Sequence, residues 1–127
     1  MLRVQNAVTV IFLFMSLFST ASSASQHEGY FLNASFYSSG SRTASGELFN
    51  QHGFTAASRT LPFGTRLCVT NPATGRSVVV RINDRGPFVR GRDLDLARGA
   101  AAAIGMIEQG TATLKIVRLS GSASVNL

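Results

Sequence analysis

The chain has 127 residues, enough for one domain, and its single cysteine excludes an intrachain disulfide or a cysteine-based metal cluster. Its 12 lysine and arginine residues outnumber 6 aspartate and glutamate residues, which gives a formal charge of +6. The basic residues stand singly between Arg42 and Arg118, so we expect anionic polymers as partners and no nucleic acid.

The N-terminal segment has the pattern of a secretory signal peptide. Arg3 precedes an apolar stretch at 7–18, and small residues follow up to Ala24. The apolar stretch is shorter than the roughly 20 residues of a membrane-spanning helix, so we expect cleavage after Ala24; an uncleaved anchor is the alternative. The predicted organisation is a signal peptide at 1–24, a linker at 25–32, one domain at 33–119 and a frayed tail at 120–127.

Three regions after the signal peptide predict β-structure. Residues 29–37 form a strand with aromatic ends. Residues 66–71 and 77–83 are rich in β-branched side chains and are joined by the turn P-A-T-G, which predicts a hairpin. Residues 111–119 alternate apolar and polar side chains as a half-buried strand does.

One helix is expected, at 95–106. Asp95 is a suitable N-cap, the alanines favour helix, and Gly105 can end it. Several short strands with one helix predict an all-β, closed or nearly closed barrel, because closure removes exposed strand edges.

Asp84 is the sharpest candidate for chemistry. It stands where the apolar strand V-V-V-R-I ends in N-D-R-G-P, and loops at strand ends often carry function. The alternative is purely structural, because Asn and Asp are also good turn formers.

Glu47 and His52 are further candidates in a polar loop, with a solvated surface position as the alternative for each. Cys68 lies in an apolar run, and we expect a buried, inert thiol. The chain lacks the ligand spacing of a zinc site and the motifs of serine hydrolases and nucleotide binders, so we expect no metal and no cofactor.

Three longer stretches together resemble the rare lipoprotein A family of bacterial cell-wall proteins. They are T-A-S-G-E-L-F-N-Q-H-G-F-T-A-A-S-R-T-L-P-F-G-T at 43–65, G-R-S-V-V-V-R-I-N-D-R-G-P-F at 75–88 and G-R-D-L-D-L-A at 91–97. The resemblance covers residues 33–117. It implies a six-stranded double-psi β-barrel with one or two short helices, and lytic transglycosylase activity on peptidoglycan glycan strands.

The resemblance also assigns residues to the site. It places the family's N-D-R-G-P acid on Asp84, its T-A-S-G-E glutamate on Glu47 and the following histidine on His52. The aspartate of its D-L-S-like element falls on Asp95, which we nevertheless predict to be the structural helix cap. We expect the substrate's hydroxyl and N-acetyl groups to be bound by Tyr37, Asn83 and Arg85.

In the implied reaction, the C6 hydroxyl of N-acetylmuramic acid displaces N-acetylglucosamine and leaves a 1,6-anhydro end. We expect Asp84 to protonate the leaving oxygen and then to accept the hydroxyl proton, with Glu47 and His52 as positioning or electrostatic partners. Arg85 favours the charged form of Asp84, so burial or the charge of Glu47 must favour the neutral form.

Two other functions stay open. A non-catalytic, expansin-like module would bind glycan without cleaving it, using Phe54, Phe63 or Phe88 as a platform; a hydrolase would use Glu47 as a second carboxylate. Family members often carry a cysteine at the signal cleavage site for a lipid anchor. None stands here, and we expect a monomeric periplasmic protein without a membrane anchor.

Overall fold

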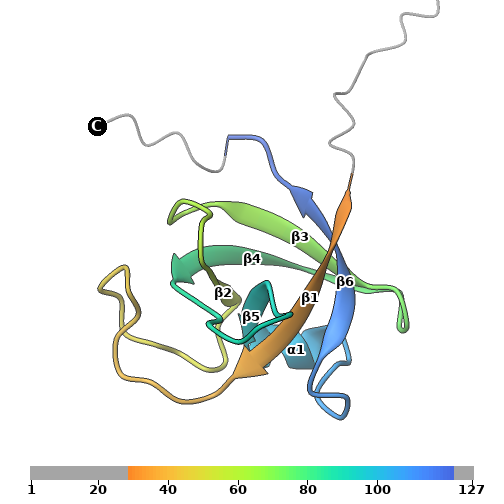
Figure 1. The fold of residues 1–127 in the computed structure, drawn as a ribbon, viewed down its shortest axis with the longest axis horizontal. Helices are drawn as coiled ribbons and strands as arrows, with labels where there is room; N and C mark the ends of the chain where they lie inside the picture. The colour runs from red at the N-terminus through yellow and green to blue at the C-terminus, as the bar shows by residue number, and fades with distance from the viewer. Residues whose placement is uncertain (1–28, 122–127) are drawn as a thin grey trace, which may run out of the picture.

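The computed structural model describes residues 29–121 and shows a closed six-stranded barrel (Figure 1). The strands are β1 (Tyr30–Tyr37), β2 (Thr55–Ser58), β3 (Arg66–Asn71), β4 (Arg76–Asp84), β5 (Leu94–Ala97) and β6 (Ala112–Arg118), and the helix is α1 (Arg98–Ala103). The strand order is β1-β5-β2-β4-β3-β6. The pairs β1–β5 and β2–β4 are parallel, and the other four are antiparallel. The predicted all-β barrel with a short helix is confirmed.

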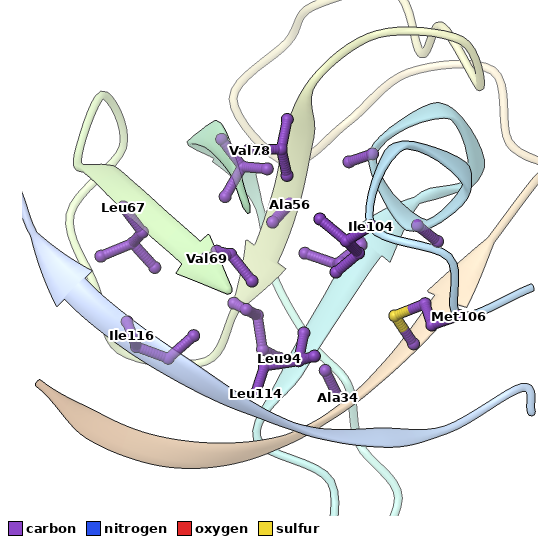
Figure 2. Close-up of a cluster of buried hydrophobic side chains, with 14 of the residues drawn as sticks. Ala34, Ala56, Leu67, Val69, Val78, Leu94, Ile104, Met106, Leu114 and Ile116 are labelled. Atoms are coloured by element: carbon purple, nitrogen blue, oxygen red, sulfur yellow. The ribbon is translucent and has the colours of Figure 1, made fainter. Parts of the chain in front are cut away.

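The core fills the inside of the barrel because the strands alternate inward and outward side chains. On β3 and β4, Leu67 pairs with Val80, and Val69 pairs with Val78, and all four are buried. Figure 2 shows Leu67, Val69 and Val78 in the interior of the barrel. Each fully buried aliphatic side chain contributes about 1.5–3 kcal/mol to stability. The neighbouring Cys68 lies on the outer face and is half-buried, so the prediction of a buried thiol is wrong in its placement.

The hairpin, the first strand and the last strand are where the sequence predicts them. β3 and β4 pair through Asn71 and Arg76 around the turn at 72–75. β1 begins at Tyr30, so it overlaps the stretch at 25–32 expected to be a linker. The predicted signal peptide and most of the predicted tail lie outside the described residues. Within residues 29–121 no helix has the length and apolar character needed to cross a bilayer.

The predicted helix start is wrong, and β2 and β5 are unpredicted. Residues 94–97 form β5 between β1 and β2, and the N-cap of α1 is Ala97, with no side-chain capping bond. Asp95 is therefore a strand residue and not a cap. Leu94 and Leu96 are fully buried in the barrel, so pairing with two strands distant in sequence outweighs the local preference for helix.

The end of the helix is where the sequence predicts it. Gly105 has a φ of +72°, and its N–H donates to Ala102 O while that of Met106 donates to Ala101 O, the Schellman arrangement. The carbonyl of Ile104 accepts hydrogen bonds from Asn71 Nδ2 at 2.9 Å and Thr74 Oγ1 at 2.8 Å. The β3–β4 turn therefore holds the C-terminus of α1 against the barrel.

The N-terminal part of α1 packs tightly on the loop before β2. The Gly99 N–H donates to Gln51 O at 2.6 Å, and a Cβ at Gly99 would lie 2.5 Å from His52 O and 2.8 Å from His52 Cα. Those are backbone atoms, so they cannot turn away as a side chain would.

We predict that Gly99→Ala lowers the free energy of unfolding by about 1–3 kcal/mol, the usual cost of overpacking. Helix propensity alone predicts the opposite sign, a gain of about 1 kcal/mol. Chemical denaturation measures the difference, and Ala102→Gly, at an exposed position of the same helix, measures the propensity effect by itself. A more stable Gly99→Ala variant would contradict the close approach.

Candidate active site

Two carboxylates face the same cleft because of how four strands pair. Ala57 of β2 pairs with Asp84 of β4 on one side and with Asp95 of β5 on the other, and Asp95 pairs with Ser35 of β1. Directly paired residues point to the same face of a sheet. Since neighbouring strands lie about 4.8 Å apart, the two aspartate Cα atoms lie about 10 Å apart, with Ala57 on the strand between them.

A β-bulge gives Asp84 this direction. Ala56 pairs with Ile82, but the next residue, Ala57, pairs with Asp84, so Asn83 is the extra residue of the bulge. Ile82 points into the core, and in a regular strand a residue two positions later would also point inward. The inserted Asn83 reverses this alternation and turns Asp84 to the outer face.

The cleft around these carboxylates has a volume of about 360 Å³. Its floor is β1 and β2, and one wall is the loop between β4 and β5, which crosses in front of the strands (Figure 1). Phe88, in that wall, is 81% exposed. The lining side chains with hydrogen-bonding groups are Ser35, Tyr37, Ser39, Asp84, Arg85, Arg92 and Asp95.

Asp84 accepts hydrogen bonds at both carboxylate oxygens. Oδ1 accepts from the backbone N–H of Ala44 at 2.8 Å and of Arg85 at 2.9 Å, and Oδ2 accepts from the Tyr37 hydroxyl at 3.1 Å. Burial and the charge of Asp84 raise the pKa of Tyr37, so Tyr37 remains a donor at neutral pH. The Tyr37 ring stacks on Phe49, with centroids 4.5 Å apart. All three groups donate to Asp84, so its carboxylate is the acceptor in each of these hydrogen bonds.

Asp95 has a different environment. It is half-buried, and its one side-chain hydrogen bond among the described residues comes from Ser35 Oγ at 2.9 Å. Burial raises the pKa of Asp95; the bond from Ser35 and the charge of Arg92 oppose that rise, and the charge of Asp84 adds to it. Burial therefore favours the neutral, protonated form of Asp95 in the cleft.

Glu47 does not line the cleft; it fastens the 43–47 loop, whose Ala44 N–H donates to Asp84. Its carboxylate receives both guanidinium nitrogens of Arg81, at 2.8 Å for Nη2, and the amide of Asn83 at 3.4 Å. The bond from Arg81 lowers the pKa of Glu47 to about 2. In the same loop the Ser45 N–H donates to Asn83 O, and the next residue back is Ala44, which donates to Asp84.

The predicted substrate-binding residues have mixed positions. Tyr37 lines the cleft. Arg85 also lines it, but its Nη1 donates to the carbonyls of Ser58 and Leu61, and its guanidinium lies 3.9 Å from the centre of the Phe63 ring. Asn83 is 2% exposed and lies outside the cleft, where it supports the loop.

His52 also lies apart from the two carboxylates. It is exposed and precedes β2, next to the start of α1, whereas Asp84 pairs near the far end of β2. Within residues 29–121, no three His, Cys, Asp or Glu side chains gather closely enough to bind a metal ion.

From the sequence we did not predict that Ser35, Arg92 and Asp95 line the cleft. The signal for Asp95 was present in R-D-L-D-L-A, where aspartate and leucine alternate with the period of a half-buried strand. No comparable local signal marks Ser35 or Arg92.

Comparison with known proteins agrees with this architecture. A model of a family described as lytic transglycolase matches residues 31–116. A relative from Nostoc, named "Probable endolytic peptidoglycan transglycosylase RlpA", is 59% identical over 88 residues, which cover 65% of this chain and 24% of the relative. A relative from Pasteurella multocida, named "Endolytic peptidoglycan transglycosylase RlpA", is 46% identical over 105 residues, which cover 74% of this chain and 36% of the relative. The chain thus spans about a quarter to a third of the length of these relatives.

A solved structure supports the fold separately. A mutant Clavibacter michiganensis expansin in complex with cellohexaose aligns with a TM-score of 0.59 and 21% identity, over 72% of this chain and 50% of the expansin. That likeness concerns the fold alone, and with the strand order it confirms the expected double-psi β-barrel. Since the family match extends over nearly the whole barrel, from β1 to β6, the chain belongs to the lytic transglycolase family.

Proposed function

We propose that this chain is an endolytic peptidoglycan lytic transglycosylase, which cleaves the bond between N-acetylmuramic acid and N-acetylglucosamine and leaves 1,6-anhydro ends. The observation that carries the proposal is the pair Asp84 and Asp95 in one open cleft, with different surroundings. Family membership and the names of the relatives support it. Export to the periplasm, a monomeric state and the absence of a membrane anchor are further parts of the proposal.

Because their surroundings differ, the two carboxyls have different roles in the reaction. Asp95, whose pKa burial raises, donates its proton to the glycosidic oxygen as the C1–O bond breaks. The resulting carboxylate then accepts the proton of the C6 hydroxyl as the O6–C1 bond forms, so no water is consumed. This assignment moves the acid role from Asp84, where the sequence suggested it, to Asp95, because every partner of Asp84 donates to it.

Asp84 stabilises the positive charge that develops on the sugar ring. Its oxygens are fixed by two backbone donors and Tyr37, so the charge is already oriented when substrate binds. Glu47 acts as a positioning residue, because it anchors the 43–47 loop that brings the Ala44 N–H to Asp84.

A non-catalytic glycan-binding module is the second candidate, and Phe88 favours it. This ring is 81% exposed at the cleft wall, where an apolar sugar face could stack on it. Phe63 is less suited to that role because Arg85 covers it. The expansin of the same fold was solved with cellohexaose. A glycan platform and the two carboxyls can serve one site, so product analysis decides between the functions.

We predict that the chain releases anhydro-muropeptides from purified sacculi and that Asp95→Asn lowers their rate of formation by about 10²–10⁴, the usual contribution of a general acid. Asp84→Asn lowers it as well, because a neutral amide does not stabilise the developing charge. Mass spectrometry of the soluble fragments is the measurement, and Glu108→Gln, an exposed carboxylate outside the cleft, is the matched control. Reducing ends would indicate a hydrolase, and binding to sacculi without fragments would indicate the module.

A second prediction concerns the pH dependence of cleavage. The acid must be protonated in free enzyme, so kcat/KM falls as the pH rises through the pKa of Asp95. Ser35 lowers that pKa by donating to the carboxylate, and Ser35→Ala therefore moves the falling limb to higher pH. The pH profile of kcat/KM measures the shift, with Ser39→Ala, elsewhere in the cleft lining, as control. If the falling limb of the profile does not shift in Ser35→Ala, Asp95 is not the general acid.

A third prediction concerns the loop anchor. The folded-state pKa of Glu47, about 2, lies below the ordinary value of 4.5, so its ion pair with Arg81 stabilises the fold above pH 4.5 and is lost as the pH falls toward 2. Following the Glu47 side-chain carboxyl carbon by NMR should give a midpoint near 2. In the Arg81→Gln variant the midpoint rises, and an unchanged midpoint would show that Arg81 is not the cause.

A further inference from the structure

A second hollow adjoins the cleft and has no part in the chemistry above. Its volume is about 580 Å³, larger than the cleft itself. It is lined by Asn33, Ala34, Arg90, Gly91, Arg92, Thr111, Ala112 and Thr113.

The two hollows follow one another along β1. Residues 33–34 line the second hollow, residues 35–37 line the cleft, and Arg92 lines both. At about 3.3 Å per residue, Asn33 and Tyr37 lie about 13 Å apart along the strand. A chain molecule whose reacting bond lies at Asp95 would therefore extend directly over the second hollow.

The side chains around this hollow present hydrogen-bond donors and positive charge. Among the described residues, Arg90 is exposed and has no ion pair or side-chain hydrogen bond. Asn33 Oδ1 accepts the Thr113 hydroxyl at 3.0 Å, which leaves the Asn33 amide N–H₂ as a donor. Arg92 adds a second guanidinium between the hollow and Asp95.

Of residues 29–121, none with a carboxylate lines the hollow to offset this charge. The nearest acid in sequence, Asp93, lines a different pocket, and its oxygens accept from Arg59 Nη2 at 3.5 Å and from the Asn33 N–H at 3.2 Å. A lining with two guanidinium groups and no carboxylate suits an anionic ligand, and guanidinium groups bind carboxylates in a bidentate manner.

We propose that Arg90, Arg92 and Asn33 form a subsite for a carboxylate of the glycan strand, next to the cleaved bond. The inference rests on the proposed function, since it takes peptidoglycan as the strand in the cleft. The carboxylate has two possible sources there: the free lactyl group of a muramic acid without its peptide, or the stem peptide. Both present the same group to the arginines.

The test measures binding, so that it does not depend on cleavage. Calorimetry on the full chain carrying Asp95→Asn compares three muramic-acid oligosaccharides of equal length: peptide-free, peptide-free with the lactyl carboxylates converted to methylamides, and peptide-bearing. The proposal expects roughly tenfold tighter binding for at least one carboxylate form than for the methylamide form, the effect of one charge-assisted hydrogen bond. Preference for the peptide-free form identifies the lactyl group, and preference for the peptide-bearing form identifies the peptide.

Two arginine variants make the test specific. Arg90→Gln should abolish the preference between carboxylate and methylamide forms, whereas Arg118→Gln removes the same charge at the far end of β6 and should keep it. Equal affinity for all three oligosaccharides, or equal losses in the two variants, would overturn the proposal. If instead the preference is present but wild type releases no anhydro ends, the subsite stands and the proposed catalytic function fails.

Discussion

The site depends on one irregularity in one strand, the bulge at Asn83. Pleated strands point alternate side chains inward and outward, and β4 keeps this rule through Val78, Val80 and Ile82. The extra residue reverses the alternation just as the strand ends. A carboxylate that a regular strand would bury in an apolar core is thereby placed on the surface beside Asp95. A bulge disrupts the hydrogen-bond ladder locally, and here the Ser45 N–H of the 43–47 loop donates to the carbonyl of Asn83.

The same scaffold gives two identical side chains different surroundings. Asp84 lies at a strand end, where backbone N–H groups of two loops and a tyrosine hydroxyl reach it. Asp95 lies in the middle of a short strand between β1 and β2, where neighbouring strands shield it from water and Ser35 is its hydrogen-bond partner. Desolvation favours the neutral acid and donors favour the anion. The different roles that we propose for the two carboxyls thus follow from their positions in the barrel.

Several of the predicted site residues hold the segments around the carboxyls in place. Glu47 and Arg81 hold the loop that supplies a donor to Asp84, and Arg85 ties the β2–β3 connection to the end of β4. A sequence motif can therefore indicate a site although several of its residues lie outside the cleft. Glu47 and Asn83 belong to that supporting set, and the cleft itself is completed by Ser35 and Arg92 from other segments.

The local sequence determined the hairpin, the end of the helix and the end of β4. Alternating β-branched residues around P-A-T-G specified the hairpin, Gly105 ended the helix because glycine tolerates a positive φ, and the end of β4 put Asp84 at a rim. The alternation of aspartate and leucine at 93–96 is compatible with a strand, but the tertiary structure decided that residues 94–97 are strand and not helix. Leu94 and Leu96 become buried because β5 pairs with β1 and β2. The partner residues on those strands lie about 40 to 60 positions away in sequence, so no local preference predicts the pairing. For the same reason the partnership of Asp84 with Asp95 could not be read from the chain: it exists only where barrel closure brings β4, β2 and β5 side by side.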